Sequence, residues 1–156
     1  MNIAIVGYGA VGKHYIELLG SFKKVKKIFL IKKNKIKNLY KKCVITTFKD
    51  ISKKEIKLDY AIICTPSGSH YLHASYFLKK GIDTLIEKPF VLSLKDAKKL
   101  VSLKKKTKTK CWVAFQNRHN LAIERGKKII KKKKFGNPFF VDSALYWHRS
   151  KKYYST

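Results

Sequence analysis

The sequence predicts an α/β fold, a doubly wound parallel sheet, and three observations support this class. Over residues 1–115 of the 156, short apolar segments alternate with longer segments of helical periodicity. Most of the apolar segments are rich in β-branched residues, as is typical of strands that are buried on both faces. The first of these segments runs directly into three closely spaced glycines. Alternation of this kind favours a parallel sheet with right-handed crossovers.

Each predicted element has its own signal. The strands are short and mostly apolar: Asn2–Val6, Lys27–Ile31, Val44–Thr46, Tyr60–Cys64, Asp83–Ile86 and Lys110–Ala114. The helices lie between them, over residues 11–22, 35–42, 69–80 and 93–106. Ser93 stands three residues before Asp96, which resembles a capping box, and Gly81 follows two lysines as a helix C-cap does. In the first helix, one side is predicted to be apolar: Val11, Tyr15, Leu18, Leu19 and Phe22.

The three glycines follow the first strand in the order Gly-x-Gly-x-x-Gly. In a phosphate-binding turn, Gly7 lets the chain leave the strand sharply, Gly9 lets the backbone approach a pyrophosphate, and Gly12 lets the next helix pack closely. That helix begins, near Ala10 and Val11, with unpaired N–H groups and the positive end of its dipole. The turn therefore predicts a dinucleotide site of the Rossmann type, and the alternative is a glycine-rich turn that serves packing alone.

The organisation changes after Phe115. A helix is predicted over residues 121–134, and a Gly-Asn-Pro turn follows it. The alternation over Phe139–Trp147 then predicts a strand, which is long and aromatic and needs a sheet to cover it. We therefore expect a dinucleotide-binding domain over residues 1–120 and the beginning of an incomplete α+β second domain over 121–156.

The composition limits the classes of protein. The net charge is +28, from 37 Lys and Arg against 9 Asp and Glu. Only three of the basic residues are arginines, whereas proteins that read bases or clamp phosphates rely on the planar fork of arginine. Because the lysines are spread over every predicted helix and loop, we expect a solvated surface and no specific nucleic-acid partner. The alternative is a polyanion-binding protein driven by charge.

The sequence also favours a cytoplasmic protein without a membrane partner. No apolar run is long enough to cross a bilayer, and the first apolar segment ends in glycines rather than in a signal-peptide cleavage site. The cysteines, at positions 43, 64 and 111, are odd in number, far apart and without Cys-x-x-Cys spacing. They are typical of reduced core residues.

Polar residues gather where three of the predicted strands end. They are Thr65, Pro66 and His70 after the fourth strand, Glu87-Lys88-Pro89 after the fifth, and Gln116-Asn117-Arg118-His119-Asn120 after the sixth. The carboxyl ends of parallel strands lie at one edge of a sheet, where open α/β sheets bind ligands. We therefore expect one ligand site at this edge.

These motifs and their order resemble the Gfo/Idh/MocA oxidoreductases, the family of glucose–fructose oxidoreductase and inositol dehydrogenase. The resemblance covers the whole chain and depends on the glycine turn, Thr-Pro-x-x-x-His at 65–70 and Glu-Lys-Pro at 87–89. It implies an NAD(P)-dependent enzyme that transfers a hydride between the nicotinamide and a sugar or nucleotide sugar. The stretches 116–120 and 146–149 and the tyrosines at 153–154 look most like UDP-N-acetylglucosaminuronate 3-dehydrogenases.

The resemblance also implies roles for single residues. Thr65, Pro66 and His70 are expected beside the ribose and nicotinamide of the cofactor, and Glu87 and Lys88 where the nicotinamide meets the substrate. It implies a cis peptide bond before the proline that follows Lys88. Lys88 is the predicted catalytic residue, since a lysine there can bond the reacting hydroxyl, stabilise an alkoxide or act as a base. The alternative is one surface lysine among many.

Candidate substrate residues come from the later part of the sequence: Gln116, Asn117, Arg118, Asn120 and Arg149. Arg149 is notable because arginine is scarce, and it can bind a carboxylate or phosphate in a bidentate way. The alternative is an ordinary surface position. His70 and His73 are three residues apart, but no third ligand is evident, and no metal site is predicted.

Two features depart from the family's pattern. NAD-specific sites place an acidic residue about 20 positions beyond the glycines, but here Ile31 is followed by Lys32, Lys33 and Asn34. The cofactor is therefore NAD or NADP, with NADP favoured. The Asp-x-x-x-His pair of the family's second domain is absent from these residues. We expect a truncated chain, completed by a C-terminal chain or a homo-oligomer, or else an inactive NAD(P)-binding module.

Overall fold

A computed structural model describes residues 1–32, 41–53, 55–133, 135–144 and 146–151 of the chain. The chain divides into two compact units, Met1–Phe115 and Gln116–Thr156. The domain boundary expected after residue 120 falls inside the second unit. A short 3-10 helix, Gln116–His119, packs against the helix that follows it and belongs with that helix.

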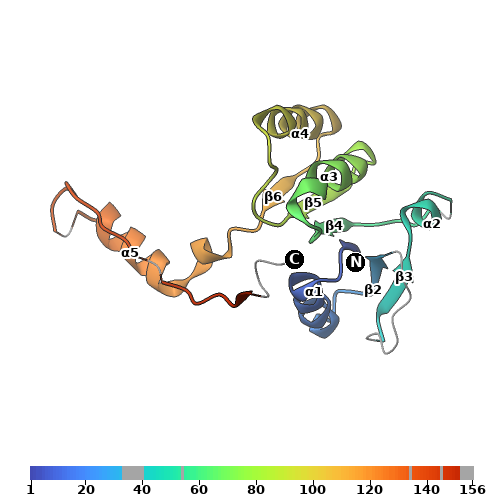
Figure 1. Ribbon diagram of the computed structural model, residues 1–156, viewed down its shortest axis with the longest axis horizontal. Helices are drawn as coiled ribbons and strands as arrows, with labels where there is room; N and C mark the ends of the chain where they lie inside the picture. Colours follow the sequence, from blue (N-terminus) through green and yellow to red (C-terminus); the bar gives the residue numbers. More distant parts are fainter. Residues whose placement is uncertain (33–40, 54, 134, 145, 152–156) are drawn as a thin grey trace. The chain divides into compact units, whose positions relative to one another are not determined.

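The first unit is built on a six-stranded sheet in which every pairing is parallel. Its strands are β1 (Asn2–Val6), β2 (Lys27–Ile31), β3 (Cys43–Thr46), β4 (Tyr60–Ile63), β5 (Asp83–Ile86) and β6 (Cys111–Val113). The spatial order is β3-β2-β1-β4-β5-β6 (Figure 1). The chain winds outward from β1 in one direction and then in the other, which is the doubly wound Rossmann order. The predicted fold class is confirmed.

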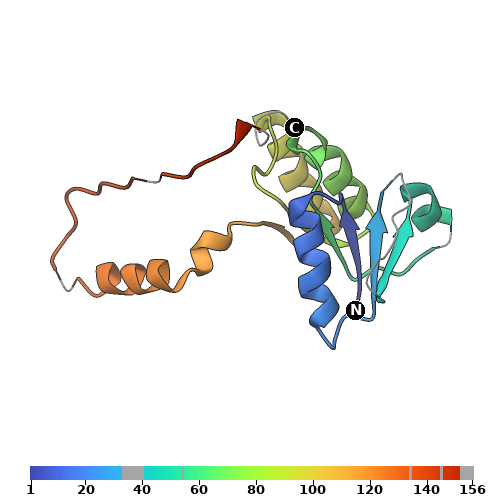
Figure 2. The same ribbon diagram turned by 60° about the horizontal axis from the view of Figure 1, so that its bottom comes forward.

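Helices cover both faces of this sheet, and Figure 2 shows α1 on one side with α3 and α4 on the other. Their bounds are Ala10–Ser21 for α1, Phe48–Lys53 for α2, His70–Lys79 for α3 and Leu94–Thr107 for α4. Alternate residues of β1 point to the two sides, so that Ile5 packs with α1, and Ala4 with α3. Each face of the sheet therefore has its own apolar core.

The predicted buried side of α1 is confirmed in part, because Tyr15 and Leu19 are partly buried and pack against the core. Gly12 and Ile16 are its buried residues, whereas Val11, Leu18 and Phe22 are each more than two-fifths exposed. Close packing of Gly12 against the sheet turns Ile16, four residues later, to the same side. The contact at the glycine, rather than the count of apolar residues, sets the orientation of the helix.

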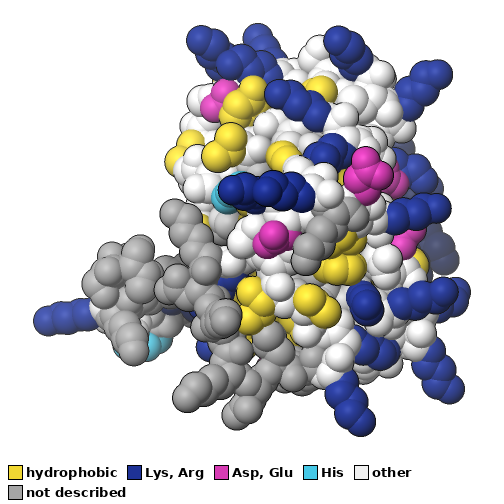
Figure 3. All heavy atoms as spheres, turned by 90° about the vertical axis from the view of Figure 1, so that its right-hand side faces the viewer, with side chains coloured by type: hydrophobic (Ala, Val, Ile, Leu, Met, Phe, Trp, Pro, Cys, Tyr) yellow, Lys and Arg dark blue, Asp and Glu magenta, His cyan; other side chains and the backbone are white. Residues whose placement is uncertain are grey.

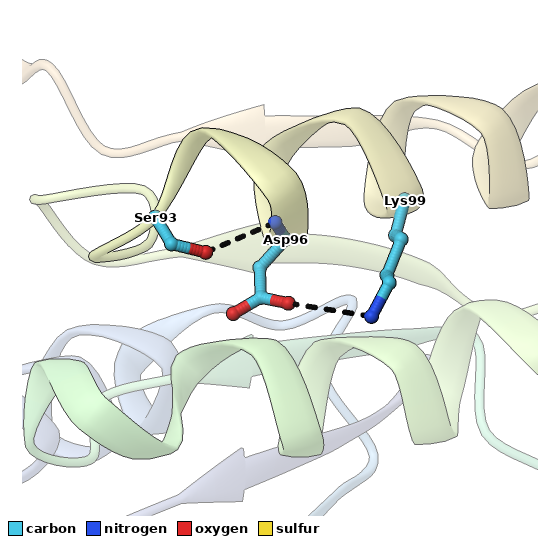
Figure 4. A network of polar contacts seen from close by, with 3 residues as sticks. All are labelled: Ser93, Asp96 and Lys99. Carbon is cyan, nitrogen blue, oxygen red and sulfur yellow. Dashed lines mark hydrogen bonds and ion pairs between the residues drawn. The ribbon is translucent and has the colours of Figure 1, made fainter.

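The predicted cap of α4 is present. The Ser93 hydroxyl accepts a hydrogen bond from the Asp96 N–H at 3.1 Å, and an oxygen of Asp96 lies 3.8 Å from the Lys99 ammonium (Figure 4). Gly81, directly after the C-cap of α3, has φ +74°, as predicted for a residue that ends a helix. Both signals were local, which is why the sequence located them correctly.

Two helix predictions have other outcomes. The helix expected over residues 35–42 lies mostly on positions 33–40, outside the described residues, and residues 41–42 form a turn. Helix α2 was not predicted, because its six residues are too few for a periodicity. Its signal was the spacing of Thr47 and Asp50, since the Thr47 hydroxyl accepts from the Asp50 N–H at 3.1 Å.

The second unit contains α5 (Leu121–Lys131), which the sequence predicted. The strand predicted over Phe139–Trp147 is wrong for the residues that the structure describes there, none of which is paired as a strand. A strand needs a neighbour for its N–H and C=O groups, and the side chain of Phe139 is fully exposed. The alternation of apolar and polar residues marks an apolar face, but it does not show whether a strand or helix covers that face.

Within the described residues, none of the helices combines the length and the apolar composition that crossing a bilayer requires.

Candidate functional site

The glycine turn joins β1 to α1, and two of its glycines are required by the fold. Gly7 has φ +103°, and a Cβ there would lie 2.6 Å from the carbonyl oxygen of Cys64 on the neighbouring strand end. A Cβ at Gly12 would overlap the carbonyl oxygen of Gly7. Both positions therefore exclude any side chain, as predicted for a tight turn and for close packing of helix on strand.

Gly9 differs from both, because nothing in the structure requires a glycine there. Its φ of −74° and ψ of −172° suit any residue, and a Cβ would meet no atom within 4 Å. It is the N-cap of α1, where no side chain caps the helix and no acidic residue occupies the first turn. The N–H groups in the first turn of α1 therefore have no side-chain cap and can bind an anion, and the bare backbone at Gly9 suits a pyrophosphate.

Two lysines lie beside this turn. The ammonium groups of Lys13, on α1, and Lys32, directly after β2, each lie 5.2 Å from the ring centroid of Tyr8. The sequence had singled out Lys32 but not Lys13, which is one helical turn beyond Gly9. Lys33, also predicted to bind the cofactor, lies outside the described residues. The end of β2 therefore carries positive charge next to the glycine turn.

Two histidines of α3 form polar contacts with the loop after β4. His70 is 1% exposed, and its ring lies between two loops, with Nε2 2.8 Å from the Thr65 carbonyl oxygen and Nδ1 2.8 Å from that of Pro89. His73 Nδ1 lies 3.1 Å from the Thr65 hydroxyl, and its ring stacks on Phe48. Burial, together with the charge of His70, lowers the pKa of His73.

This geometry separates the roles of Thr65, Pro66 and His70. Thr65 is half-buried and Pro66 exposed at the loop surface, whereas the ring nitrogens of His70 face backbone carbonyls. If His70 contributes to a cofactor site, it does so indirectly, by holding the two loops whose carbonyl oxygens its ring contacts. In the described ranges, no three His, Cys, Asp or Glu side chains come together as metal ligands would.

The Glu87–Lys88–Pro89 turn follows β5, and its Lys88–Pro89 bond is cis, as the resemblance implied. The half-buried Glu87 carboxylate accepts hydrogen bonds from the Tyr15 hydroxyl at 3.1 Å and from the Lys88 backbone N–H at 3.3 Å. Lys88 is exposed, and its amino group makes no hydrogen bond or ion pair within the described part of the chain. It is available to a ligand.

Tyr15, which bonds the Glu87 carboxylate, and Cys64, which feels its charge, were not predicted as site residues. Burial raises the pKa of both, to about 12 for the Cys64 thiol, and the negative charge of Glu87 raises them further. Both groups therefore keep their protons at neutral pH, which makes Tyr15 a hydrogen-bond donor and Cys64 a poor nucleophile. The sequence predicts Tyr15 only as part of an apolar helix face.

The candidate substrate residues all belong to the second unit. They are exposed: Gln116, Asn117, Arg118, Asn120 and Arg149. Asn120 caps α5, because its side-chain oxygen accepts from the Ala122 N–H at 2.9 Å. The Arg149 guanidinium lies 4.8 Å from the Trp147 ring centroid, a cation–π contact. Their part in substrate binding stays a prediction.

The surface charge is dispersed on the face that Figure 3 shows. Lys and Arg side chains are spread around this face, with Asp and Glu side chains and patches of apolar ones between them. A face of this kind lacks the single basic stripe that tracks a nucleic-acid backbone.

A family model described as "Oxidoreductase family, NAD-binding Rossmann fold" matches residues 1–115. Among curated proteins, the uncharacterised oxidoreductase YhhX of Escherichia coli is 33% identical over 96 residues, which are 61% of this chain and 27% of that protein. The UDP-N-acetylglucosamine 3-dehydrogenase of Acidithiobacillus ferrooxidans is 20% identical over 143 residues, 92% of this chain and 44% of that protein. The chain thus spans less than half the length of these relatives.

Solved structures agree on the fold. The crystal structure of YhhX superposes with a TM-score of 0.76 at 23% identity, over 87% of this chain and 41% of that one. The apo scyllo-inositol dehydrogenase of Lactobacillus casei gives 0.76 at 22%, over 87% and 43%. With the glycine turn, the strand-end motifs and the family match over residues 1–115 in place, the chain belongs to the Gfo/Idh/MocA oxidoreductases, a family with an NAD-binding Rossmann fold.

Proposed function

We propose that this chain is the cofactor-binding part of an NAD(P)-dependent oxidoreductase that transfers a hydride to or from a sugar or nucleotide sugar. Gly9 carries the proposal: the fold does not need a glycine there, but a pyrophosphate at the open N–H groups of α1 does. The bound cofactor supplies a nicotinamide that accepts or donates the hydride. The residues of the chain bind and orient it.

Lys88 is the proposed catalytic residue. Its exposed ammonium lies at the end of β5, on the edge of the sheet that also carries the glycine turn and Thr65. Without an internal partner, it can donate a hydrogen bond to the reacting oxygen of the substrate and stabilise the negative charge that develops there. Glu87 and Thr65 are proposed to line the cofactor beside it.

We further propose NADP rather than NAD as the cofactor. In dinucleotide folds the end of the second strand lies beside the adenosine ribose, where an acidic residue selects NAD. Here that position carries Lys32, with Lys13 on the other side of the same Tyr8 ring. Two ammonium groups favour a 2′-phosphate. Lys32→Glu is expected to weaken NADPH binding about tenfold, the scale of one charge-assisted contact, without weakening NADH binding.

A nucleotide sugar is the proposed substrate of the whole protein. The support is the similarity to a UDP-N-acetylglucosamine 3-dehydrogenase over 92% of this chain and the likeness to UDP-N-acetylglucosaminuronate 3-dehydrogenases in the stretches 116–120 and 146–149. The exposed Arg118 and Arg149 suit its diphosphate or a carboxylate. The second candidate is an NAD(P)-binding module that turns nothing over, and its support is that the family match, to an NAD-binding Rossmann fold, covers residues 1–115.

We also propose that the second unit packs against further polypeptide. Large apolar side chains of α5 and the segment after it are strongly exposed: Leu121, Ile130, Phe135, Phe139 and Trp147. The occupant is a continuation of the chain, a complementing chain or a second copy.

The three cysteines are free thiols, which supports a reducing, cytoplasmic location.

Calorimetric titration with NADPH and NADH tests the cofactor site. We expect Gly9→Val to weaken binding about 100-fold, the loss expected when several N–H contacts to a phosphate are blocked. Gly20→Val is the matched control, because Gly20 lies on the same helix and a Cβ there also meets open space. Both variants are expected to melt close to wild type. Equal binding by wild type and Gly9→Val would rule out the phosphate assignment.

The reaction is tested by following NAD(P)H absorbance with UDP-sugars as substrates. Turnover that Lys88→Met abolishes supports the enzyme. Cofactor binding without turnover of any UDP-sugar supports the module. No saturable cofactor binding at moderate salt would rule out both and leave the charge-driven polyanion binder.

A further inference from the structure

Glu87 and Lys88 are adjacent and oppositely charged, yet their side chains do not pair. Each oxygen of the carboxylate instead accepts a hydrogen bond from another group. Oε1 accepts from the Tyr15 hydroxyl and Oε2 from the backbone N–H of Lys88. The Lys88 amino group, by contrast, has no polar partner in the described ranges of the chain.

The hydroxyl that holds Glu87 comes from a remote part of the sequence. Tyr15 stands 72 residues earlier, on α1, within two turns of the glycine turn. Its ring is half-buried, and burial with the nearby carboxylate raises the pKa of the phenol. The phenol is therefore a permanent donor at neutral pH, and the carboxylate an acceptor only.

We propose that Tyr15 is a positioning residue that turns the Glu87 carboxylate toward α1 and so keeps the Lys88 ammonium free of an internal counter-ion. If that hydroxyl is removed, the carboxylate loses a partner and gains the freedom to pair with the neighbouring ammonium. The inference deepens the proposed function, because an unpaired ammonium is what the reacting oxygen of a substrate requires.

The test measures the reactivity of Lys88 toward trace acetic anhydride by peptide mass spectrometry, with the other lysines of the same sample as internal standards. Tyr15→Phe keeps the ring but lacks the hydroxyl. We expect it to slow acetylation of Lys88 about two- to fivefold, the factor that an exposed ion pair supplies. Adding Glu87→Gln to Tyr15→Phe is expected to restore the wild-type rate, because the carboxylate is gone.

Tyr60→Phe is the matched control. Tyr60 lies at the opposite end of β4, and its hydroxyl makes no hydrogen bond to any residue that the structure describes. Its loss is expected to leave the rate at Lys88 unchanged. A Lys88 rate that Tyr15→Phe does not lower, or that Glu87→Gln does not restore, would overturn the proposal, because a merely structural tyrosine gives neither result.

Glu87→Gln alone covers the case in which Tyr15→Phe does not fold. The proposal expects an unchanged Lys88 rate in this variant, since the carboxylate already faces α1. A faster rate would mean that Glu87 pairs with Lys88 in the wild type, and the proposal would be wrong. Protection of Lys88 by NADPH tests the proposed function separately. Absence of protection counts against cofactor binding beside Lys88 and leaves the result for Tyr15 standing.

Discussion

The two units of the chain use the same kinds of sequence pattern with opposite results. In Met1–Phe115, Phe77 is completely buried, and apolar residues from both faces of the sheet meet helices. In the second unit, none of the described residues is buried, and Phe139 is fully exposed. A hydrophobic pattern therefore states which face of an element is apolar. Whether that face is covered depends on another element being present.

The largest expected effect distinguishes the glycines of the two units. Gly12→Val is expected to destabilise the protein by about 4 kcal/mol or more, because the new side chain overlaps the Gly7 carbonyl. Gly126→Ala, on α5 where a Cβ meets open space, is expected to raise helicity slightly, with no loss. Urea unfolding followed by circular dichroism measures both. A stable Gly12→Val variant would contradict the packing described for α1.

A core truncation sharpens the comparison. Leu100 on α4 is 0% exposed, and Leu100→Ala is expected to cost about 2–5 kcal/mol of unfolding free energy. Ile130 on α5 is 57% exposed, and Ile130→Ala is expected to change it by about 0.5 kcal/mol at most. Equal losses in chemical denaturation would show that the second unit has a core of its own or a partner in solution.

His70 provides a prediction of intermediate size. Its ring reaches carbonyl oxygens on two loops, and an asparagine side chain is too short to reach both. His70→Asn is therefore expected to cost about 1–3 kcal/mol, the range for a buried polar contact left unmade. The control is His119→Asn in the exposed 3-10 helix of the second unit. A melting temperature equal to wild type in both variants would mean that His70 does not join the loops.

The smallest expected effect concerns pH. The pKa of His73 is lowered in the folded protein by burial, so below pH about 6.5 the unfolded chain binds more protons at this site than the folded chain does. Stability is therefore expected to fall as pH drops from about 7 through the lowered pKa. His73→Gln is expected to flatten this part of the stability curve, and His148→Gln, in the exposed second unit, to leave it unchanged.

Local signals predicted the fold of the first unit well. β1, β2 and β5 have the predicted bounds, because each is an apolar run between polar or turn residues. Helix α2 was missed because it is shorter than any reliable periodicity. The strand predicted over 139–147 was wrong because pairing depends on residues outside the segment.

The candidate site also contains some residues that the sequence predicts and others that it does not. The strand-end motifs were predictable, because a parallel sheet places its carboxyl ends at one edge. Tyr15 and Lys13 were not, since their partners are set by the topology: Tyr15 contacts a carboxylate 72 residues away. The position of His70 after β4 was predictable, but its contact with the Pro89 carbonyl was not, because the spacing of the motif does not show which residues of the next loop lie nearby.

Gly9 has a consequence for how such a site can change. The proposed contact with phosphate uses main-chain N–H groups alone, which every amino acid except proline possesses, so it does not depend on the identity of a side chain. On this proposal, substitutions that change the choice of coenzyme or substrate fall at the ends of β2, β5 and β6 or in the second unit. A main-chain anchor of this kind leaves the side chains that set specificity free to change independently of it.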